Sequence, residues 1–192
     1  DSMAAALKAA NDNCWDILSD TSWPGYYERP HRLMEGYLML MREAIEQVPE
    51  VPTHIFLQAG VGGLAGSCAA LARDAWGAAP TIVVVEPELA PALVASVKAG
   101  EFVTAEGPVS NMGRLDCKEP SLIALKGLAR DADAFITLTE DEGTVGADLA
   151  QAHGYPSSTS GAAGLAGLIT TQQALAIGGD ARVLCILSEG PA

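Results

Sequence analysis

The sequence has little positive charge and no long apolar run. It has 11 Lys and Arg against 24 Asp and Glu, which gives a formal net charge of −13 over 192 residues. A chain this acidic repels phosphate backbones and anionic membranes, so binding to nucleic acid or to such a membrane is not expected. No apolar run approaches the ~20 residues that a transmembrane helix needs. The first residues show no basic stretch leading into an apolar core, so no signal peptide is expected.

The sequence also lacks clustered cysteines and histidines. It has 4 cysteines and 3 histidines, with no C-x-x-C and no H-E-x-x-H motif. A disulfide framework would be denser and a zinc site needs closer ligands, so neither is predicted. Reduced thiols indicate a cytoplasmic protein. The cysteines are Cys14, Cys68, Cys117 and Cys185.

Apolar residues and glycine, in contrast, are abundant. Hydrophobic residues make up 49% of the chain and there are 20 glycines, which suffices for a core and excludes a disordered chain. Short segments that are apolar on both faces alternate with segments of helical length, as in a parallel sheet covered by helices on both faces. The sequence therefore predicts a single α/β domain over residues 1–192. Strands are expected at 53–57, 81–85, 134–138 and 183–187, and helices at 2–13, 31–48, 64–76, 88–98, 120–131, 140–152 and 161–177.

Residues 16–30 interrupt this alternation. Their Pro, Gly and Asp content breaks both periodicities and predicts a loop. The loop contains Trp23, Tyr26 and Tyr27, which favours a loop packed over a core or pocket rather than a linker. Trp23 and Tyr26 are expected to pack within this region rather than to stack on a ligand. The helix expected at 31–48 has an apolar face that suits either a core or a partner.

A glycine-rich loop follows the first expected strand and precedes a helix. Glycines let the backbone turn sharply and present several N–H groups to an anion, and the helix N-terminus adds its positive dipole. The sequence therefore predicts a cradle for a phosphate or a carboxylate. A Cβ at either of the two adjacent glycines is expected to point into the position of the anion. The cradle residues are Gly60, Val61, Gly62, Gly63 and Leu64.

One interpretation of this loop is a dinucleotide site. Gly60-x-Gly62-x-x-Ala65 satisfies the fingerprint, and Glu86 ends the next strand about twenty residues later, where an acid would hold a ribose 2′-hydroxyl. This favours an NAD-binding domain of an oxidoreductase. The fingerprint, however, normally follows the opening strand of its domain, whereas about fifty residues precede it here. The NAD interpretation does not account for those residues.

Six ordered blocks run from Ser-Asp-Thr-Ser-Trp-Pro-Gly-Tyr at 19–26, through the glycine loop, to Ser-Glu-Gly at 188–190. They resemble blocks of the diaminopropionate ammonia-lyases, a family of fold-type II pyridoxal-phosphate (PLP) enzymes. The glycine loop resembles the phosphate-binding loop of that fold type. Ser-Asp-Thr-Ser-Trp-Pro-Gly-Tyr resembles the family's Asp-Thr-Ala-Trp-Glu-Gly-Tyr block, and Ser-Glu-Gly near the end resembles its Thr-Glu-Gly. Six ordered blocks over nearly the whole chain are more specific than one glycine loop. The blocks lie at 19–26, 58–66, 84–87, 111–120, 160–165 and 188–190.

The resemblance implies the large-lobe portion of a fold-type II enzyme, with PLP as cofactor and its phosphate at the glycine loop. It implies an elimination that releases ammonia from 2,3-diaminopropionate, a small amino acid, although related members deaminate serine or threonine. Ser188 would place its hydroxyl beside the pyridine nitrogen. Asp20 would contact the substrate amine or move a proton near it. A homodimer is expected, and Arg114 and Asp116 are expected to form a surface ion pair without a catalytic step.

One part that the resemblance implies is missing. In the family, a lysine of the smaller N-terminal lobe binds the cofactor covalently, and that lobe precedes the first matched block. The sequence therefore resembles the middle to C-terminal part of a longer enzyme, and the isolated 192 residues are expected to be inactive. A non-catalytic module that keeps the cradle without the lysine remains an alternative. The lysines, none in a matching context, are Lys8, Lys98, Lys118 and Lys126.

Overall fold

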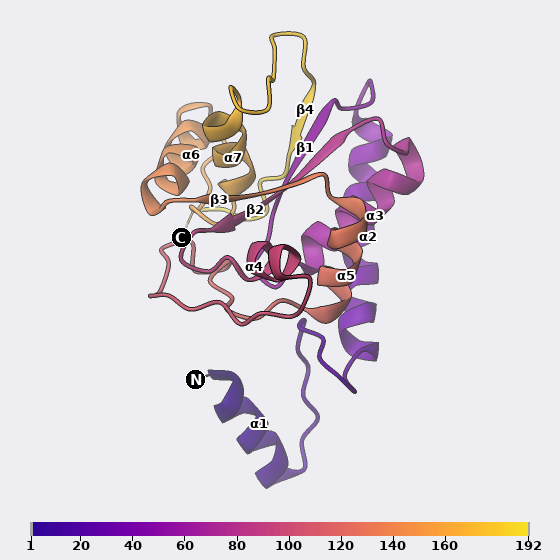
Figure 1. Ribbon diagram of the computed structural model, residues 1–192, viewed down its shortest axis with the longest axis vertical. Coiled ribbons are helices and arrows are strands. Elements are labelled where there is room, and N and C mark those ends of the chain that lie inside the picture. Colours follow the sequence, from indigo (N-terminus) through magenta and orange to yellow (C-terminus); the bar gives the residue numbers. More distant parts are fainter. Residues whose placement is uncertain (1, 192) are drawn as a thin grey trace.

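The sheet at the centre of the molecule has four parallel strands in the order β3-β2-β1-β4. The computed structural model describes residues 2–191, and Figure 1 shows the strands crossing the middle of the body with helices on either side. The α/β class expected from the sequence is confirmed. The strands are β1 (His54–Gln58), β2 (Thr81–Pro87), β3 (Ala134–Leu138) and β4 (Val183–Cys185). The helices are α1 (Ser2–Asn13), α2 (Glu28–Gln47), α3 (Gly63–Trp76), α4 (Ala92–Ala99), α5 (Leu122–Asp131), α6 (Glu140–Ala152) and α7 (Ala163–Thr171).

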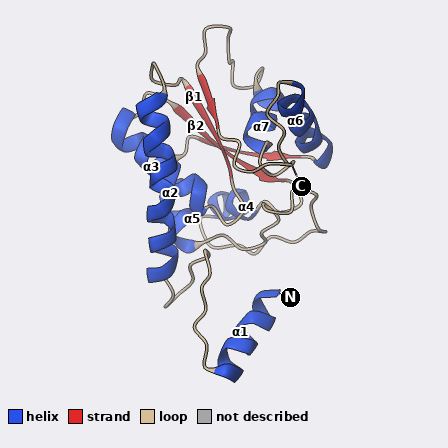
Figure 2. Cartoon of the chain, turned by 180° about the vertical axis from the view of Figure 1, so that it is seen from behind, coloured by secondary structure: helices blue, strands red, loops and turns tan. Residues whose placement is uncertain are grey.

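Alternate residues of the central strands face two separate cores, because successive side chains of a strand point to opposite faces. Ile55 and Leu57 of β1 pack in one cluster with Met41 of α2. Phe56 of the same strand packs in the other cluster with Ala163 of α7. Figure 2 shows α2, α3 and α5 on one face of the sheet and α6 and α7 on the other. Burial on both faces explains why the strands read as continuous apolar runs.

The register brings the ends of β1 and β4 to the same edge. His54 is aligned with Thr81 of β2 and with Val183 of β4, and both pairings are parallel. The segments that follow β1 and β4 therefore leave the sheet side by side, at the carboxyl edge where parallel sheets bind ligands. The glycine loop follows β1, and Ser188 follows β4 by a short stretch.

The helices whose starts differ most from those expected are α2 and α4. α2 begins at Glu28, inside the stretch predicted to be a loop, and Pro30 lies in its first turn. A proline there removes no helical hydrogen bond, so it does not break the helix. α4 begins at Ala92 rather than at 88, because Pro91 disfavours helical backbone at the residue before it.

Two elements end two or more residues earlier than expected. α7 ends at Thr171 rather than at 177, and the chain then passes through a turn in which Ala176 has φ +52°. β4 ends at Cys185 rather than at 187. The carbonyl oxygen of Ile186 accepts a hydrogen bond from the Gln58 side chain at 2.8 Å, beyond the last aligned pair of the ladder.

Helix α1 lies apart from the body of the molecule, to which residues 14–27 connect it (Figure 1). In that connection the rings of Trp23 and Tyr26 stack on each other, with centroids 4.1 Å apart and planes at 11°. The expectation that these two residues pack within the region is confirmed. Across residues 2–191, no helix has both the length and the apolar character needed to cross a membrane.

Candidate cofactor site

A pocket opens at the carboxyl ends of β1 and β4, and we call it the strand-end pocket. Its volume is about 350 Å³, within the range of about 300–1,000 Å³ that small-molecule sites occupy. The structure brings every predicted site residue to this pocket, namely Asp20, the loop 60–64 and Ser188. The other lining residues are Tyr37, Leu40, Gln58, Ala59, Arg114, Leu115, Cys117 and Glu189.

The glycine loop presents free backbone donors to this pocket. Gly62 has φ +94° and turns the chain into α3, and its carbonyl oxygen accepts from Gly66 N at 2.8 Å. The N–H groups of Gly62, Gly63 and Leu64 donate to no other atom of residues 2–191. They lie at the start of α3, where the helix dipole is positive. The loop thus has the geometry of an anion cradle that needs no basic side chain.

The direction expected for a Cβ at Gly62 is wrong. A Cβ there would lie 3.1 Å from both the Ala124 Cβ and the Leu93 Cδ1, which belong to α5 and α4. A Cβ at Gly63 would lie 3.8 Å from the Tyr37 ring, at ordinary contact distance. Gly62 is therefore required by its left-handed backbone and by the close packing behind the loop, not by the space that an anion needs.

Gly60 is required by a second close approach. A Cβ at this position would lie 2.9 Å from the Arg114 carbonyl oxygen and 3.0 Å from the Cys117 Sγ. Backbone atoms cannot give way as the end of a flexible side chain can. The loop is therefore fixed against residues 114–117 on one side and against α4 and α5 on the other.

Ser188 supplies a hydroxyl on the wall of the pocket formed after β4. Its Oγ accepts a hydrogen bond of 3.0 Å from Gln58 Nε2. Gln58 is 3% exposed, whereas Ser188 is exposed. The pocket therefore contains an anion cradle and a separate hydroxyl group, held by two neighbouring strands.

Asp20 lies in the pocket beside two groups that stay protonated at neutral pH. Burial, with the Asp20 charge as a further cause, raises the pKa of Cys117 to about 11. Burial and Asp20 likewise raise the pKa of Tyr37 above its ordinary value. The Asp20 carboxylate itself accepts a hydrogen bond from the Thr21 hydroxyl at 3.2 Å. A thiol, a phenol and a carboxylate thus lie together in the pocket, the thiol beside Gly60 and the phenol ring beside Gly63.

Two buried serines connect the Asp20 segment to the glycine loop. The Oγ atoms of Ser22 and Ser121 lie 2.8 Å apart, and Ser121 Oγ accepts from Ser22 N at 3.0 Å. Ser22 Oγ accepts from Ile123 N at 2.9 Å, so Ser22 caps α5 from a distant segment. Ser121 N donates to the Val61 carbonyl oxygen at 2.9 Å. Asp20 is therefore placed relative to the cradle through a few hydrogen bonds.

Glu86 does not lie where a ribose ligand is needed. Its side chain is fully buried, and its two carboxylate oxygens accept from Leu93 N at 2.8 Å and from Val94 N at 2.7 Å. Burial raises its pKa to about 7, against the opposing effect of these two N–H groups. Glu86 therefore caps α4, and the expectation of a ribose-binding acid at this position is wrong.

The ion pair expected between Arg114 and Asp116 is not formed. Arg114 lies 3.5 Å from the Glu189 carboxylate, and Asp116 lies 2.6 Å from Lys118 Nζ. Arg114 and Asp116 are two residues apart in an irregular segment, so their side chains point in different directions. Each therefore pairs with a different neighbour, Glu189 or Lys118. Arg114 is the only cationic residue among those lining the strand-end pocket within the described chain.

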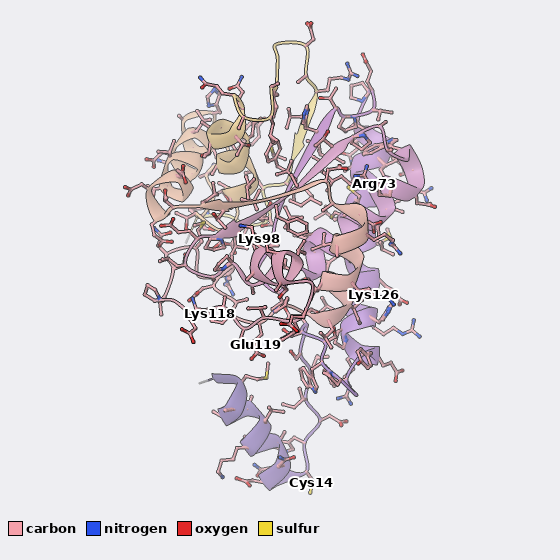
Figure 3. All side chains as sticks on the ribbon, viewed as in Figure 1. Cys14, Arg73, Lys98, Lys118, Glu119 and Lys126 are labelled. Atoms are coloured by element: carbon pink, nitrogen blue, oxygen red, sulfur yellow. The ribbon has the colours of Figure 1, made fainter. Side chains whose placement is uncertain are left out.

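None of the lysines in residues 2–191 lines the strand-end pocket. Figure 3 shows Lys98, Lys118 and Lys126 on separate parts of the body. Lys118 Nζ also donates to the carbonyl oxygens of Leu89 and Pro108. It is therefore held in place by the backbone outside the pocket.

Metal ligands are not gathered in the described part of the chain. Residues 2–191 contain no group of three or more His, Cys, Asp or Glu side chains that could hold a metal ion. All four cysteines are free, and burial raises the pKa of Cys68 and Cys185 to about 12. These two thiols belong to the cores of the domain.

Sequence reasoning missed three groups of the site: Gln58, Tyr37 and the pair of Ser22 with Ser121. Gln58 stands at the start of the matched glycine block, which was a signal for it. Tyr37 lies on the helix expected at 31–48, whose face toward the pocket no local pattern distinguishes. The two serines are 99 residues apart, so their contact has no local signal.

Comparisons with known proteins identify the family to which the chain belongs. A sequence model of the family described as "Pyridoxal-phosphate dependent enzyme" matches residues 1–189. Diaminopropionate ammonia-lyase of Escherichia coli K12 is 32% identical over 209 residues, covering 99% of this chain and 52% of the relative. The Salmonella typhimurium enzyme of the same name is 36% identical over 145 residues, covering 71% and 36%. The chain thus spans about half the length of the first relative.

Solved structures share the fold. Diaminopropionate ammonia-lyase from Escherichia coli in complex with D-serine has a TM-score of 0.88 at 29% identity, covering 98% of this chain and 52% of that one. Threonine deaminase isoform 2 from Solanum lycopersicum has a TM-score of 0.82 at 17% identity, covering 96% and 51%, and shows the fold alone. With the family match over nearly its whole length, the chain belongs to the pyridoxal-phosphate-dependent enzymes.

Proposed function

We propose that this chain is the cofactor-binding large-lobe part of an ammonia-lyase that uses PLP and acts on 2,3-diaminopropionate. The observation that carries the proposal is the meeting of three chemically different groups in one pocket. These are the N–H cradle of residues 60–64, the hydroxyl of Ser188 and the carboxylate of Asp20. The relatives named above are diaminopropionate ammonia-lyases and support this choice.

The groups present fit PLP at both ends. The N–H groups of Gly62, Gly63 and Leu64 lack partners within residues 2–191 and would bind a phosphate, with Gly60 and Val61 completing the cradle. The hydroxyl of Ser188 would donate to the pyridine nitrogen. When bound, this cofactor supplies the electron sink that elimination needs. A neutral hydroxyl beside the nitrogen leaves it unprotonated and moderates that sink.

Asp20 is the proposed acid–base or amine-binding residue. It is exposed to the pocket, and its neighbours Tyr37 and Cys117 are neutral. An exposed carboxylate suits the second ammonium group of 2,3-diaminopropionate, which serine and threonine lack. Asp20 would hold that ammonium and move a proton at the departing nitrogen. This favours diaminopropionate over serine or threonine as the substrate, while the structure of a relative with D-serine supports a small amino acid in general.

The remaining expectations are part of the proposal. The lysine that binds the cofactor covalently would come from outside residues 2–191, because no described lysine lines the pocket. The complete protein would act as a homodimer in the cytoplasm. Four free cysteines agree with a reducing compartment.

The test is an assay of the protein that contains this chain together with its lysine-bearing lobe. Titration with PLP should be saturable and titration with NADH should not. Ammonia and pyruvate should form fastest from 2,3-diaminopropionate. Saturable NADH binding without a response to PLP would overturn the cofactor. Faster turnover of serine or threonine would identify a deaminase instead, and binding of PLP without any turnover would identify a non-catalytic module.

A further inference from the structure

Gln58 is a buried amide at the end of β1, and its hydrogen-bond partners follow β4 and precede α7. It is the last residue of β1 and is 3% exposed. Its Nε2 lies 2.8 Å from the Ile186 carbonyl oxygen after β4 and 3.1 Å from the Gly161 carbonyl oxygen before α7. It also lies 3.0 Å from Ser188 Oγ. The amide therefore connects the strand-end pocket to the segments on both sides of it.

The chemistry of the amide fixes the role of Ser188 in this contact. An amide nitrogen carries two hydrogens and accepts none, so the two carbonyl oxygens and Ser188 Oγ share these two hydrogens. In this contact Ser188 Oγ can only accept from Gln58. The Ser188 hydroxyl hydrogen therefore points away from Gln58. Ser188 Oγ has no second hydrogen-bond partner within residues 2–191. Because Ser188 lines the pocket, that hydrogen is free for a ligand there.

The orientation of the amide is itself determined. A flip of the amide would place Oε1 against the carbonyl oxygens of Ile186 and Gly161, two acceptors that cannot donate. In the observed orientation Oε1 is the one buried side-chain polar atom of the described chain without a hydrogen bond. It faces Gly164, where an added Cβ would lie 2.9 Å from it. A buried oxygen without a hydrogen bond is unfavourable. The hydrogen bonds of Nε2, the other half of the amide, must therefore offset this cost.

We infer that Gln58 is a positioning residue that sets the Ser188 hydroxyl as a hydrogen-bond donor into the pocket. The inference rests on the proposed function, in which the acceptor is the pyridine nitrogen of PLP. A donor can bind that nitrogen only while it is unprotonated. By orienting the Ser188 hydroxyl, Gln58 thus favours the form of PLP whose pyridine nitrogen is unprotonated.

The experiment uses the intact enzyme reconstituted with PLP that carries ¹⁵N in the ring. Gln58→Met keeps the size of the side chain and removes the donor, so the Ser188 hydroxyl is no longer held with its hydrogen away from residue 58. The ¹⁵N signal of the ring should lose the signature of an accepted hydrogen bond, and the Kd for PLP should rise about 10-fold, the effect of one lost hydrogen bond. Ser188→Ala should give the same signal, and the double variant should bind no more weakly than Ser188→Ala alone.

Ser96→Ala is the matched control, because Ser96 is also buried and hydrogen-bonded but lies outside the strand-end pocket. It should leave the ¹⁵N signal and the Kd unchanged. If Gln58→Met does not fold, Gln58→Asn keeps the amide while drawing it back from Ser188, and it should give an intermediate shift. An unchanged ¹⁵N signal in whichever variant folds, or fully additive losses in the double variant, would overturn the role of Gln58. Failure of the unmodified enzyme to bind PLP would instead overturn the proposed function along with it.

Discussion

Two neighbouring parts of the strand-end pocket, which we call the cradle end (residues 60–64) and the acid–base end (Asp20), are built in different ways. At the cradle end, the loop 60–64 lies between β1 and α3, and added Cβ atoms at Gly60 and Gly62 would collide with backbone or with the side chains of α4 and α5. At the acid–base end, Asp20 lies in an irregular segment whose neighbours Trp15 and Leu18 are 65% and 80% exposed. Ser22 attaches that segment to α5, and Tyr26 and Arg29 bond to its residues 16–19.

The difference separates what the fold determines from what a few contacts determine. The position of the cradle follows from the packing of the sheet and three helices, so changing it disturbs the domain. The position of Asp20 depends on side-chain hydrogen bonds at the start of α5, so it can change while the domain stays intact. Variants at the two ends should therefore fail differently, one in folding and cofactor binding and the other in turnover.

The largest effect is expected at Asp20. Asp20→Asn removes the charge and the base, so turnover of 2,3-diaminopropionate should fall about 100- to 10,000-fold, the usual contribution of acid–base catalysis. The free energy of unfolding and the Kd for PLP should stay the same, because the Asp20 side chain bonds only to Thr21 within the described chain. Steady-state kinetics and a denaturant titration of the same preparation measure both. If Asp20→Asn weakened cofactor binding but kept its turnover number, Asp20 would serve cofactor binding and not the acid–base step.

At the cradle end, Gly62→Val should destabilise the domain. Its backbone has φ +94°, and the new side chain would press on Leu93 and Ala124. Strain and overpacking together should lower the free energy of unfolding by about 4 kcal/mol. PLP binding should be lost with it. Gly127→Ala is the control, because Gly127 lies in α5 with open space around it, and it should stabilise by up to about 1 kcal/mol. Normal stability in Gly62→Val would show that the loop is not fixed by its packing.

The cradle end should also respond to pH through Glu86. This group caps α4, whose Leu93 side chain would contact a Cβ at Gly62. Burial raises its pKa from 4.5 to about 7. Because the folded-state pKa is the higher one, the contribution of Glu86 to stability is fully present below pH 4.5 and is lost as the pH rises to 7. The loss should be about 3 kcal/mol.

Denaturant titrations of the unmodified protein and of Glu86→Gln at several pH values between 4 and 8 test this expectation. Glutamine does not titrate, so the difference in unfolding free energy between the two proteins should change across that window. The unmodified protein should lose stability relative to the variant as the pH rises. A difference that stays constant would show that Glu86 keeps the same protonation state when the chain unfolds.

The smallest effect is expected at the attachment of the Asp20 segment. Ser22→Ala removes the cap of α5, which should lower the free energy of unfolding by about 1 kcal/mol. Turnover should fall by more than this loss explains, because Asp20 is only two residues away, whereas the Kd for PLP should hold. Ser96→Ala provides a control, since this buried serine bonds to Ala92 O and Val103 N, outside both the segment and the pocket. Equal losses of turnover in the two variants would contradict a specific attachment role for Ser22.

The sheet, and the glycine loop that leads into α3, could be predicted from the sequence because both have local signals. Apolar runs such as Thr81–Val85 identify strands buried on two faces, and the glycines at 60–63 lie together in the chain. The boundary of α2 was missed because a proline in a first turn and a proline in a loop look alike in sequence. The partner of Arg114 was missed because Glu189 is distant in sequence.

The parts of the site that could not be predicted depend on contacts across the fold. Gln58 and Ser188 are 130 residues apart, and Ser22 and Ser121 are 99 apart. Glu86 looked like a ribose ligand because its place at the end of β2 is visible in the sequence. The direction of its side chain toward the N-terminus of α4 is set by packing and is not visible there.

The most direct test of the account is a crystal structure of the intact protein with PLP bound. We expect the phosphate within hydrogen-bond distance of the N–H groups of Gly62, Gly63 and Leu64, and the ring nitrogen within hydrogen-bond distance of Ser188 Oγ. The Gln58 amide should keep its contact with that Oγ. A phosphate bound elsewhere, or a ring turned so that its nitrogen faces another group, would contradict the account.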